Sequence, residues 1–228
     1  MRICVLVLVV LELALFPLIQ LTRASVSAFS SYLAIAFVAL FALVSAFGEK
    51  GAGHLIRLGI LFTLVADYFL VLSDGAELEG VIAFILVQLS YFAYTLVRED
   101  RVSVRRANIF TRIGLCAALI IGAVAVLGKD NDALSIVSVI YYANLLTNIV
   151  FAFLLGREAR VFAIGLVLFA MCDLCIGLEV LTSTYLDSSV LDFFYGSRLN
   201  LPWVFYQPSQ VLIGLALYRK DKARDGLN

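Results

Sequence analysis

The chain has 228 residues, 63% of them hydrophobic, and its 17 basic residues balance its 17 acidic residues. This charge balance gives no reason to expect a nucleic-acid partner, and the composition leaves no room for a soluble domain. With a mean hydropathy of +1.02, the chain is predicted to be a multi-pass protein of the cell membrane.

The first apolar run, residues 3–21, looks like a secretory signal because one arginine precedes it and small residues follow it. Glu12 in the middle of the run and the full spanning length of the run favour instead a helix that stays in the protein. We therefore expect this run to be the first transmembrane helix.

Apolar runs of about 20 residues, each long enough to cross a bilayer as a helix, recur along the whole chain. Their predicted ranges are 3–21, 27–47, 55–73, 79–97, 109–128, 132–155, 160–181 and 200–218. Short segments join these runs, so neighbouring helices are expected to pack antiparallel. The sequence thus predicts an all-α integral membrane bundle of eight transmembrane helices, which forms a single transmembrane domain over residues 1–228.

Lysine and arginine are distributed unequally between the two sides of the predicted bundle. Fourteen of the 17 fall on the side of the amino terminus, the loops after the second, fourth and sixth spans, and the carboxyl-terminal tail. The other side has only Arg23, Lys129 and Arg198. Because cytoplasmic loops carry the excess of Lys and Arg, both termini are predicted to be cytoplasmic.

Four acidic residues, Glu12, Asp67, Asp173 and Glu179, fall inside the predicted spans, and we expect no Lys, Arg or His in the centre of any span. An acid at mid-bilayer is costly, so each should face the bundle interior or a water-filled cavity.

Asp67 and Asp173 each follow a glycine by eight residues, in the third and seventh spans. This weak repeat indicates either an internal duplication or a coincidence. Two carboxyl groups that share a site can act as an acid and a base.

Polar side chains at helical spacing occur on three other predicted spans. They are Gln88 and Tyr91 on the fourth, Tyr141, Asn144 and Asn148 on the sixth, and Tyr206 and Gln210 on the eighth. Residues three or four apart share a helix face, so each set can line one cavity together with the aspartates. The alternative is ordinary hydrogen bonding between helices, which needs no ligand. Arg23, between the first two spans, either holds a lipid phosphate or anchors its helix.

The four cysteines, Cys4, Cys116, Cys172 and Cys175, all lie in apolar segments, where a thiol usually acts as a small buried hydrophobe. Cys172 and Cys175 form a C-x-x-C motif, but it has no basic neighbour to activate a thiol and no further metal ligands. We therefore expect no disulfide framework, no metal site and no cofactor.

The chain resembles the YhhN family of lysoplasmalogenase-like eight-span membrane proteins in four segments, LFTLVADYFLVL, GVIAFILVQLSYFAY, GLVLFAMCDLCIGLEV and LPWVFYQPSQVLIGLALY. Asp67 resembles the aspartate of the Gly-Asp block of that family, and Asp173 resembles that of its Ser-Asp block. Tyr206 and Gln210, with Trp203 before them, resemble its final Trp, Tyr and Gln block. Two positions depart from the family. Gln88 stands where the family usually has His three residues before Tyr91, and Arg23 is only a loose substitute for its Lys-Pro block.

The resemblance implies hydrolysis of the vinyl ether bond of lysoplasmalogens, which releases a fatty aldehyde and a glycerophospho-alcohol. This chemistry needs a proton delivered to carbon and a water molecule added to the resulting cation, so Asp67 and Asp173 together are the predicted catalytic residues. The predicted substrate-binding residues are Gln88, Tyr91, Tyr141, Asn144, Tyr206, Gln210 and Arg23. The implied partners are a lysophospholipid substrate and membrane lipid. A small proton-coupled transporter is an alternative, because membrane aspartates without a cationic partner can relay protons. A lipid-binding protein without catalysis is another, because Gln88 cannot carry a proton at physiological pH.

Overall fold

The computed structural model describes residues 2–21, 24–44, 51–128, 131–185 and 200–217. Within these ranges the chain is helical and has no β-strand. The long helices are α1 (Arg2–Leu21), α2 (Ala24–Val44), α3 (Gly53–Asp67), α4 (Glu77–Arg98), α5 (Val102–Leu127), α6 (Ala133–Leu154), α7 (Arg160–Tyr185) and α9 (Leu201–Ala216). The π-helix η1 (Tyr68–Leu72) continues α3, and the short 3₁₀ turn η3 (Arg157–Ala159) precedes α7.

Seven helices of the described chain are long and apolar enough to cross a membrane. These seven helices agree with the first seven predicted spans. A chain in lipid forms helices because each helix satisfies the hydrogen bonds of its own backbone groups. The remaining helix, α9, has 16 residues and is therefore about 24 Å long. It is shorter than the hydrocarbon core of about 30 Å, so the eighth span stays a prediction, as does the cytoplasmic position of both termini.

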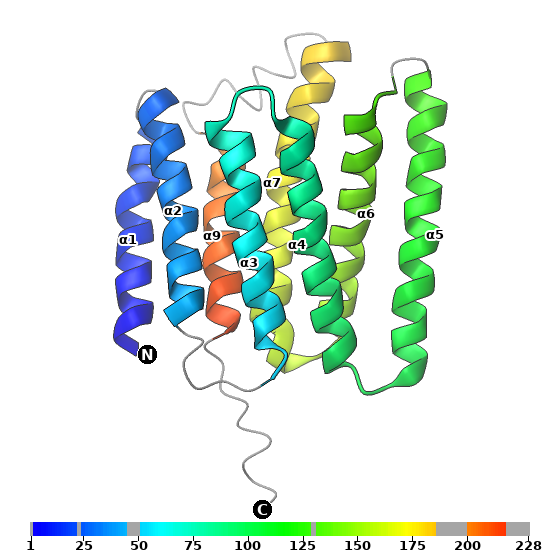
Figure 1. Ribbon diagram of the computed structural model, residues 1–228, viewed down its shortest axis with the longest axis horizontal. Helices are drawn as coiled ribbons and strands as arrows, with labels where there is room; N and C mark the ends of the chain where they lie inside the picture. Colours follow the sequence, from blue (N-terminus) through cyan, green and yellow to red (C-terminus); the bar gives the residue numbers. More distant parts are fainter. Residues whose placement is uncertain (1, 22–23, 45–50, 129–130, 186–199, 218–228) are drawn as a thin grey trace, which may run out of the picture.

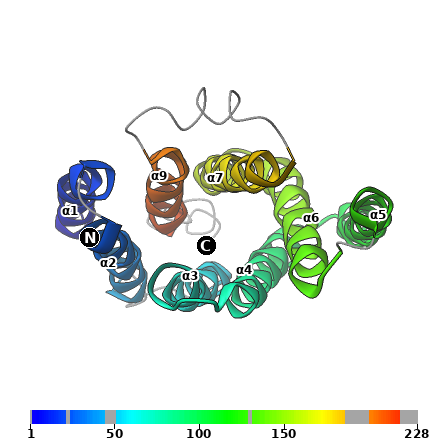
Figure 2. The same cartoon turned by 90° about the horizontal axis from the view of Figure 1, so that it is seen from above.

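Six helices form a ring whose axis runs parallel to the helices (Figure 2). In order around the ring, α2, α3, α4, α6, α7 and α9 each contact the next, and α9 closes the ring on α2. The other two helices lie outside the ring, with α1 against α2 and α9 and α5 against α6. Closing the ring places α9 beside helices from the beginning of the chain and brings residues of α3 near residues of α9.

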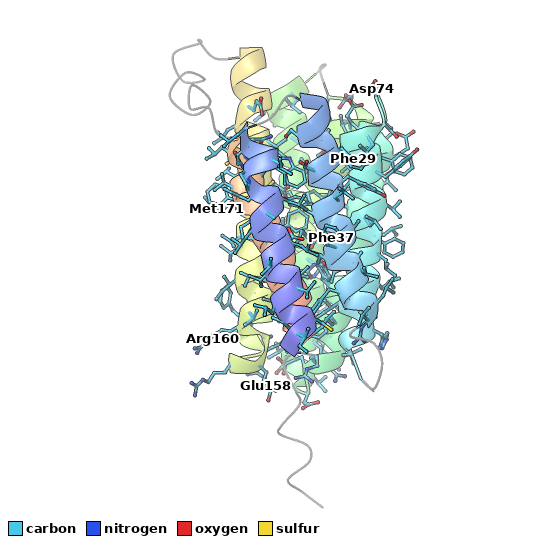
Figure 3. The ribbon with its side chains drawn as sticks, turned by 90° about the vertical axis from the view of Figure 1, so that its left-hand side faces the viewer. Phe29, Phe37, Asp74, Glu158, Arg160 and Met171 are labelled. Carbon is cyan, nitrogen blue, oxygen red and sulfur yellow. The ribbon has the colours of Figure 1, made fainter. Side chains whose placement is uncertain are left out.

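The helices run antiparallel along the chain, so that α1 begins and α9 ends at the same end of the bundle (Figure 1). We call this the basic end, because it carries Arg98, Arg101 and Arg160. Glu158 and Arg160 lie at the basic end and Asp74 lies at the opposite end (Figure 3). Arg98 forms a 2.6 Å ion pair with Glu158, which links the end of α4 to the start of α7.

Small residues let two helix pairs approach closely. Gly59 of α3 packs against the ring of Tyr91 on α4, where an added Cβ would lie 2.2 Å from the nearest ring carbon. Gly165 of α7 packs against Ile213 of α9, where an added Cβ would lie 2.8 Å from the side chain. Such close contacts take the place of the hydrophobic driving force that helices lack inside lipid.

Two of the acids predicted in the spans lie apart from the other two. Glu12 of α1 is 5% exposed, and its Oε2 accepts a 2.7 Å hydrogen bond from Nε2 of Gln207 on α9. This bond ties the outer helix α1 to the ring. Glu179, near the end of α7, is exposed.

Candidate functional site

Asp67 is the last residue of α3 before the helix widens into the π-helix η1. Its side chain is only 3% exposed, as expected for an acid that faces the interior of the bundle. The hydroxyl of Tyr206 on α9 donates to both carboxyl oxygens, at 2.9 Å to Oδ1 and 2.7 Å to Oδ2. The first and last motif segments of the chain therefore meet at this carboxyl group.

Asp173 occupies the middle of α7 and is half-buried. The hydroxyl of Tyr141 on α6 donates a 2.6 Å hydrogen bond to its Oδ2. Each predicted catalytic acid thus accepts a hydrogen bond from a tyrosine of another helix. The tyrosine that binds Asp67 is on α9, and the one that binds Asp173 is on α6.

Aromatic rings connect the two acid–tyrosine pairs. Phe169 lies one turn before Asp173, with its ring centroid 5.3 Å from that of Tyr206 and 6.4 Å from that of Tyr141. Phe169 therefore links the hydrogen-bond partners of the two acids. We call Asp67, Asp173, Tyr141, Tyr206 and Phe169 the aspartate cluster.

The aspartate cluster can donate and accept protons. Among the residues that the structure describes, no Lys, Arg or His pairs with Asp67 or Asp173. A carboxyl group donates a proton when it is neutral and accepts one when it is ionised, and two neighbouring carboxyl groups can divide these roles between them. The tyrosine hydroxyls fix the direction in which each carboxyl group points. The geometry therefore suits general acid–base chemistry in the interior of the bundle.

A second polar group lies between α4, α5 and α6. Arg112 of α5 is 8% exposed, and its guanidinium donates to Oδ1 of Asn144, of Asn148 (2.8 Å) and of Asn108 (3.3 Å). Nδ2 of Asn148 in turn donates to Gln88 at 2.9 Å. We call Arg112, Asn108, Asn144, Asn148 and Gln88 the Arg112 network.

Arg112 lies farther along its helix than the sequence predicted. The predicted fifth span began at residue 109, which placed Arg112 at its edge, but α5 begins at Val102. Arg112 comes ten residues after Val102 and therefore lies about 15 Å along the helix from the start of α5. Its charge is stabilised by amide oxygens and by the ring of Phe92, whose centroid lies 4.0 Å from the guanidinium carbon.

The predicted substrate-binding residues therefore separate into groups. Tyr141 and Tyr206 bind the aspartates directly, whereas Gln88 and Asn144 belong to the Arg112 network. Tyr91 is fully buried and packs on Phe162, with ring centroids 5.1 Å apart. Gln210 is fully buried one turn beyond Tyr206. Arg23 lies outside the described residues.

Sequence reasoning did not identify Phe169, Asn108 or Arg112 as members of these groups. A signal for the last two was present, because Asn108 and Arg112 are four residues apart and share a face of any helix that begins early enough. Phe169 carried no signal, since phenylalanine is common in apolar helices.

The cysteines and the other possible metal ligands form no further site among the described residues. None of the four cysteines forms a disulfide, and Cys172 and Cys175 are both buried. The described ranges contain no group of three or more His, Cys, Asp or Glu residues that could hold a metal ion.

Comparison with known proteins identifies the family. No curated protein and no solved structure matches the chain. The model of the YhhN family matches residues 22–217, a range that includes both aspartates, their tyrosines and the Arg112 network. Because this match covers most of the chain, the protein belongs to the YhhN family.

Proposed function

We propose that the protein is a membrane-embedded hydrolase that cleaves the vinyl ether bond of lysoplasmalogens. The observation that supports this function is the convergence of two acid–tyrosine pairs, Asp67 with Tyr206 and Asp173 with Tyr141, on one buried aromatic cluster. Membership of the YhhN family agrees with it. The fatty aldehyde and the glycerophospho-alcohol are the two products.

The reaction needs one proton donor and one proton acceptor. The neutral carboxyl group of one aspartate delivers its proton to the vinyl carbon farther from the ether oxygen, and the other vinyl carbon becomes part of an oxocarbenium ion. A water molecule adds to this carbon and loses a proton to the carboxylate of the second aspartate. As the bond between the hemiacetal carbon and the ether oxygen breaks, the second aspartate gives its proton to that oxygen and the first aspartate takes the proton of the hemiacetal hydroxyl. The aldehyde and the alcohol are released, one water is consumed, and both acids return to their starting states.

A pocket at the end opposite the basic end offers a route for a lipid. Its volume is about 280 Å³, and its lining residues are Ser27, Ala28 and Ser31 of α2, Leu70 and Val71 of η1, Asn200 and Trp203. Trp203 packs edge-on against Tyr206, with centroids 5.1 Å apart. The pocket thus adjoins the tyrosine that holds Asp67, and its mixed lining suits a lysophospholipid with both polar and apolar parts.

Aldehyde release from a lysoplasmalogen by the purified protein in detergent tests this function. Asp67→Asn and Asp173→Asn keep the size of each side chain but remove the transferable proton. Loss of one group from a general acid–base pair lowers the rate by about 100-fold or more. We therefore expect both variants to release aldehyde at no more than about 1% of the wild-type rate.

Glu179→Gln is the matched control, because it neutralises an exposed acid on the same helix as Asp173. It should turn over like the wild type. Wild-type turnover in either aspartate variant would contradict the mechanism, and a wild-type protein that releases no aldehyde would contradict the proposed function.

A proton-coupled transporter is the second candidate, and one observation favours it. Buried hydrogen bonds run from Gln88 through Asn148 to Arg112, and a proton path through the bundle would need polar groups of this kind. Proton uptake into liposomes that contain the protein, measured with a pH-sensitive dye, distinguishes the two functions. Uptake that Asp67→Asn abolishes, without aldehyde release, would favour the transporter.

A further inference from the structure

Two helices begin at the pocket beside Trp203. Its lining includes Ser27, three residues after the first residue of α2, and Asn200 and Trp203 at the start of α9. The pocket therefore lies at the amino-terminal ends of both helices, at the end of the bundle opposite the basic end (Figure 1). The start of a helix carries a partial positive charge and N–H groups without a partner inside the helix, so it favours a negatively charged ligand.

The start of α9 is held beside the pocket by an uncharged side chain of α1. The backbone N–H of Asn200 donates to Oε1 of Gln20 at 2.6 Å, and the backbone oxygen of Asn200 accepts from Nε2 of Gln20 at 3.2 Å. Asn200 is the N-cap residue of α9, and its side chain makes no capping hydrogen bond. Gln20 thus positions the first turn of α9 without neutralising its partial positive charge.

Ser31 of α2 offers a buried hydroxyl group to the same pocket. Ser31 lines the pocket although it is only 1% exposed, and its hydroxyl makes no hydrogen bond within the described ranges. The hydroxyl of Ser27, one turn earlier, already donates to the backbone oxygen of Ile19 at 2.7 Å. Buried polar groups in native proteins are nearly always hydrogen-bonded. The partner that fits the Ser31 hydroxyl is therefore a ligand in the pocket.

The volume of the pocket limits the size of this ligand. At about 280 Å³, the pocket is slightly smaller than those that enclose drug-sized molecules, which begin at about 300 Å³. A phosphate head group and a long lipid chain do not fit together in this volume. A head group with its glycerol does fit, so the chain of a bound lipid has to lie outside the pocket.

The chemistry of the pocket suits a phosphodiester. Its described lining contains no charged side chain, so the two helix starts supply the positive potential. The hydroxyl of Ser31 and the indole N–H of Trp203 are hydrogen-bond donors. A phosphodiester, which every lysophospholipid contains, carries one negative charge and accepts hydrogen bonds through its oxygens.

We propose that this pocket binds the glycerophospho head group of a lysophospholipid, with the phosphodiester beside the starts of α2 and α9 and a hydrogen bond from Ser31. The proposal rests on the proposed function for its substrate class. Trp203 connects the pocket to Tyr206, with ring centroids 5.1 Å apart, and only the glycerol separates the phosphodiester of the lipid from its ether bond. The lipid then comes from the leaflet at the end opposite the basic end, and the glycerophospho-alcohol leaves on that side.

A soluble head group tests this site without turnover. The probe is glycerophosphoethanolamine, titrated into the full chain in detergent, with inorganic phosphate and glycerol as comparison molecules. Binding is followed by the fluorescence of Trp203, the single tryptophan of the chain, and by the melting temperature, which rises when a ligand binds the folded state. We expect the probe to bind about tenfold or more tightly than either comparison molecule, since each of them matches only part of the site.

Ser31→Ala removes the hydroxyl and should weaken binding of the probe about tenfold or more, the effect of one hydrogen bond to a charged group. Ser31→Leu places a larger side chain in the pocket and should abolish binding. Ser30→Ala is the matched control, because Ser30 is the neighbouring buried serine of α2 and does not line the pocket. It should bind the probe like the wild type, and the melting temperatures without the probe check that each variant is folded.

Equal binding of the probe to Ser31→Ala and the wild type would overturn the proposal. Weakening by Ser30→Ala as large as by Ser31→Ala would do the same, and inorganic phosphate that binds as tightly as the probe would identify a site for free phosphate instead. A wild type that releases aldehyde but does not bind the probe would refute the head-group site and leave hydrolysis standing. A wild type that binds the probe but releases no aldehyde would refute hydrolysis and leave the head-group site standing.

Discussion

At the scale of single residues, the distinctive feature is a tyrosine hydroxyl that hydrogen-bonds to both carboxyl oxygens of a buried aspartate. Tyr206 donates to Oδ1 and Oδ2 of Asp67, so the carboxyl group is held in one orientation. A hydrogen bond to a charged group is stronger than one between neutral groups. Tyr206 should therefore contribute to the reaction through the position and the protonation of Asp67.

Tyr206→Phe tests this contribution because it removes one hydroxyl and keeps the ring that packs on Phe169 and Trp203. A hydrogen bond to a charged group is worth about 1.5–3 kcal/mol, so we expect kcat for aldehyde release to fall about 10- to 100-fold. KM should change by less than about threefold, since the ring contacts remain. Tyr68→Phe is the control, because Tyr68 follows Asp67 directly and is 48% exposed. A larger change in KM than in kcat would contradict this role for Tyr206.

The residues of the site could be predicted from the sequence only in part. Asp67 and Asp173 were identifiable because an acid within an apolar run needs an explanation wherever the helix lies. That Tyr206 binds Asp67 was not identifiable, since 139 residues separate them. Gln88 and Asn144 were predicted to line a cavity with the aspartates, but they hydrogen-bond within the Arg112 network.

At the scale of helices, α3 carries Asp67 and is positioned by its contact with α4. A π-helix follows Asp67 directly, and such wide turns often occur at functional sites because they redirect the side chains around them. Gly59, two turns before Asp67, lets α3 approach the buried ring of Tyr91. The same spacing of Gly165 and Asp173 on α7 serves a similar contact with α9.

The duplication suggested by these glycines stays a hypothesis. The two acids differ in their partners, because Asp67 binds a tyrosine of α9 and Asp173 binds a tyrosine of α6. The similarity is thus in helix packing and not in the hydrogen bonds of the acids.

Gly59→Ala should disturb the position of α3. Its Cβ would lie 2.2 Å from a ring carbon of Tyr91, and Tyr91 is fully buried and has no space to move into. Overpacking of this kind costs about 1–3 kcal/mol, so we expect a lower melting temperature in detergent and slower aldehyde release.

Gly114→Ala is the matched control, because no atom lies within 4 Å of its added Cβ. Its melting temperature should equal or slightly exceed that of the wild type, since alanine favours helices more than glycine does. Equal melting temperatures for Gly59→Ala and the wild type would contradict the close packing of α3 on α4.

At the scale of the whole molecule, the ring of six helices surrounds the aspartate cluster and the outer surface is apolar. Only 6% of the membrane-spanning window of α5 is buried inside the protein, so its apolar surface is left for lipid. The unequal distribution of Lys and Arg predicts that the basic end faces the cytoplasm. The pocket beside Trp203 would then open toward the other side of the membrane.

Cysteine labelling in intact cells tests this orientation. With the four native cysteines replaced by alanine, Asp74→Cys places a thiol at the end opposite the basic end, and Glu158→Cys places one at the basic end (Figure 3). We expect a membrane-impermeant maleimide to label Asp74→Cys in intact cells and Glu158→Cys only after permeabilisation. The reverse pattern would show that the basic end faces outward.

The sequence by itself determined the class of the protein, the approximate positions of its helices, its two central acids and its family resemblance. These properties depend on composition and on order along the chain, which the sequence contains directly. Only the tertiary structure decided that Tyr206 hydrogen-bonds to Asp67, that Tyr141 hydrogen-bonds to Asp173, and that three asparagines accept hydrogen bonds from Arg112. The physical reason is that a helix apolar on all sides does not reveal which face meets a neighbour. The rotation and the partner of each helix come from side-chain packing between segments that are distant in the chain.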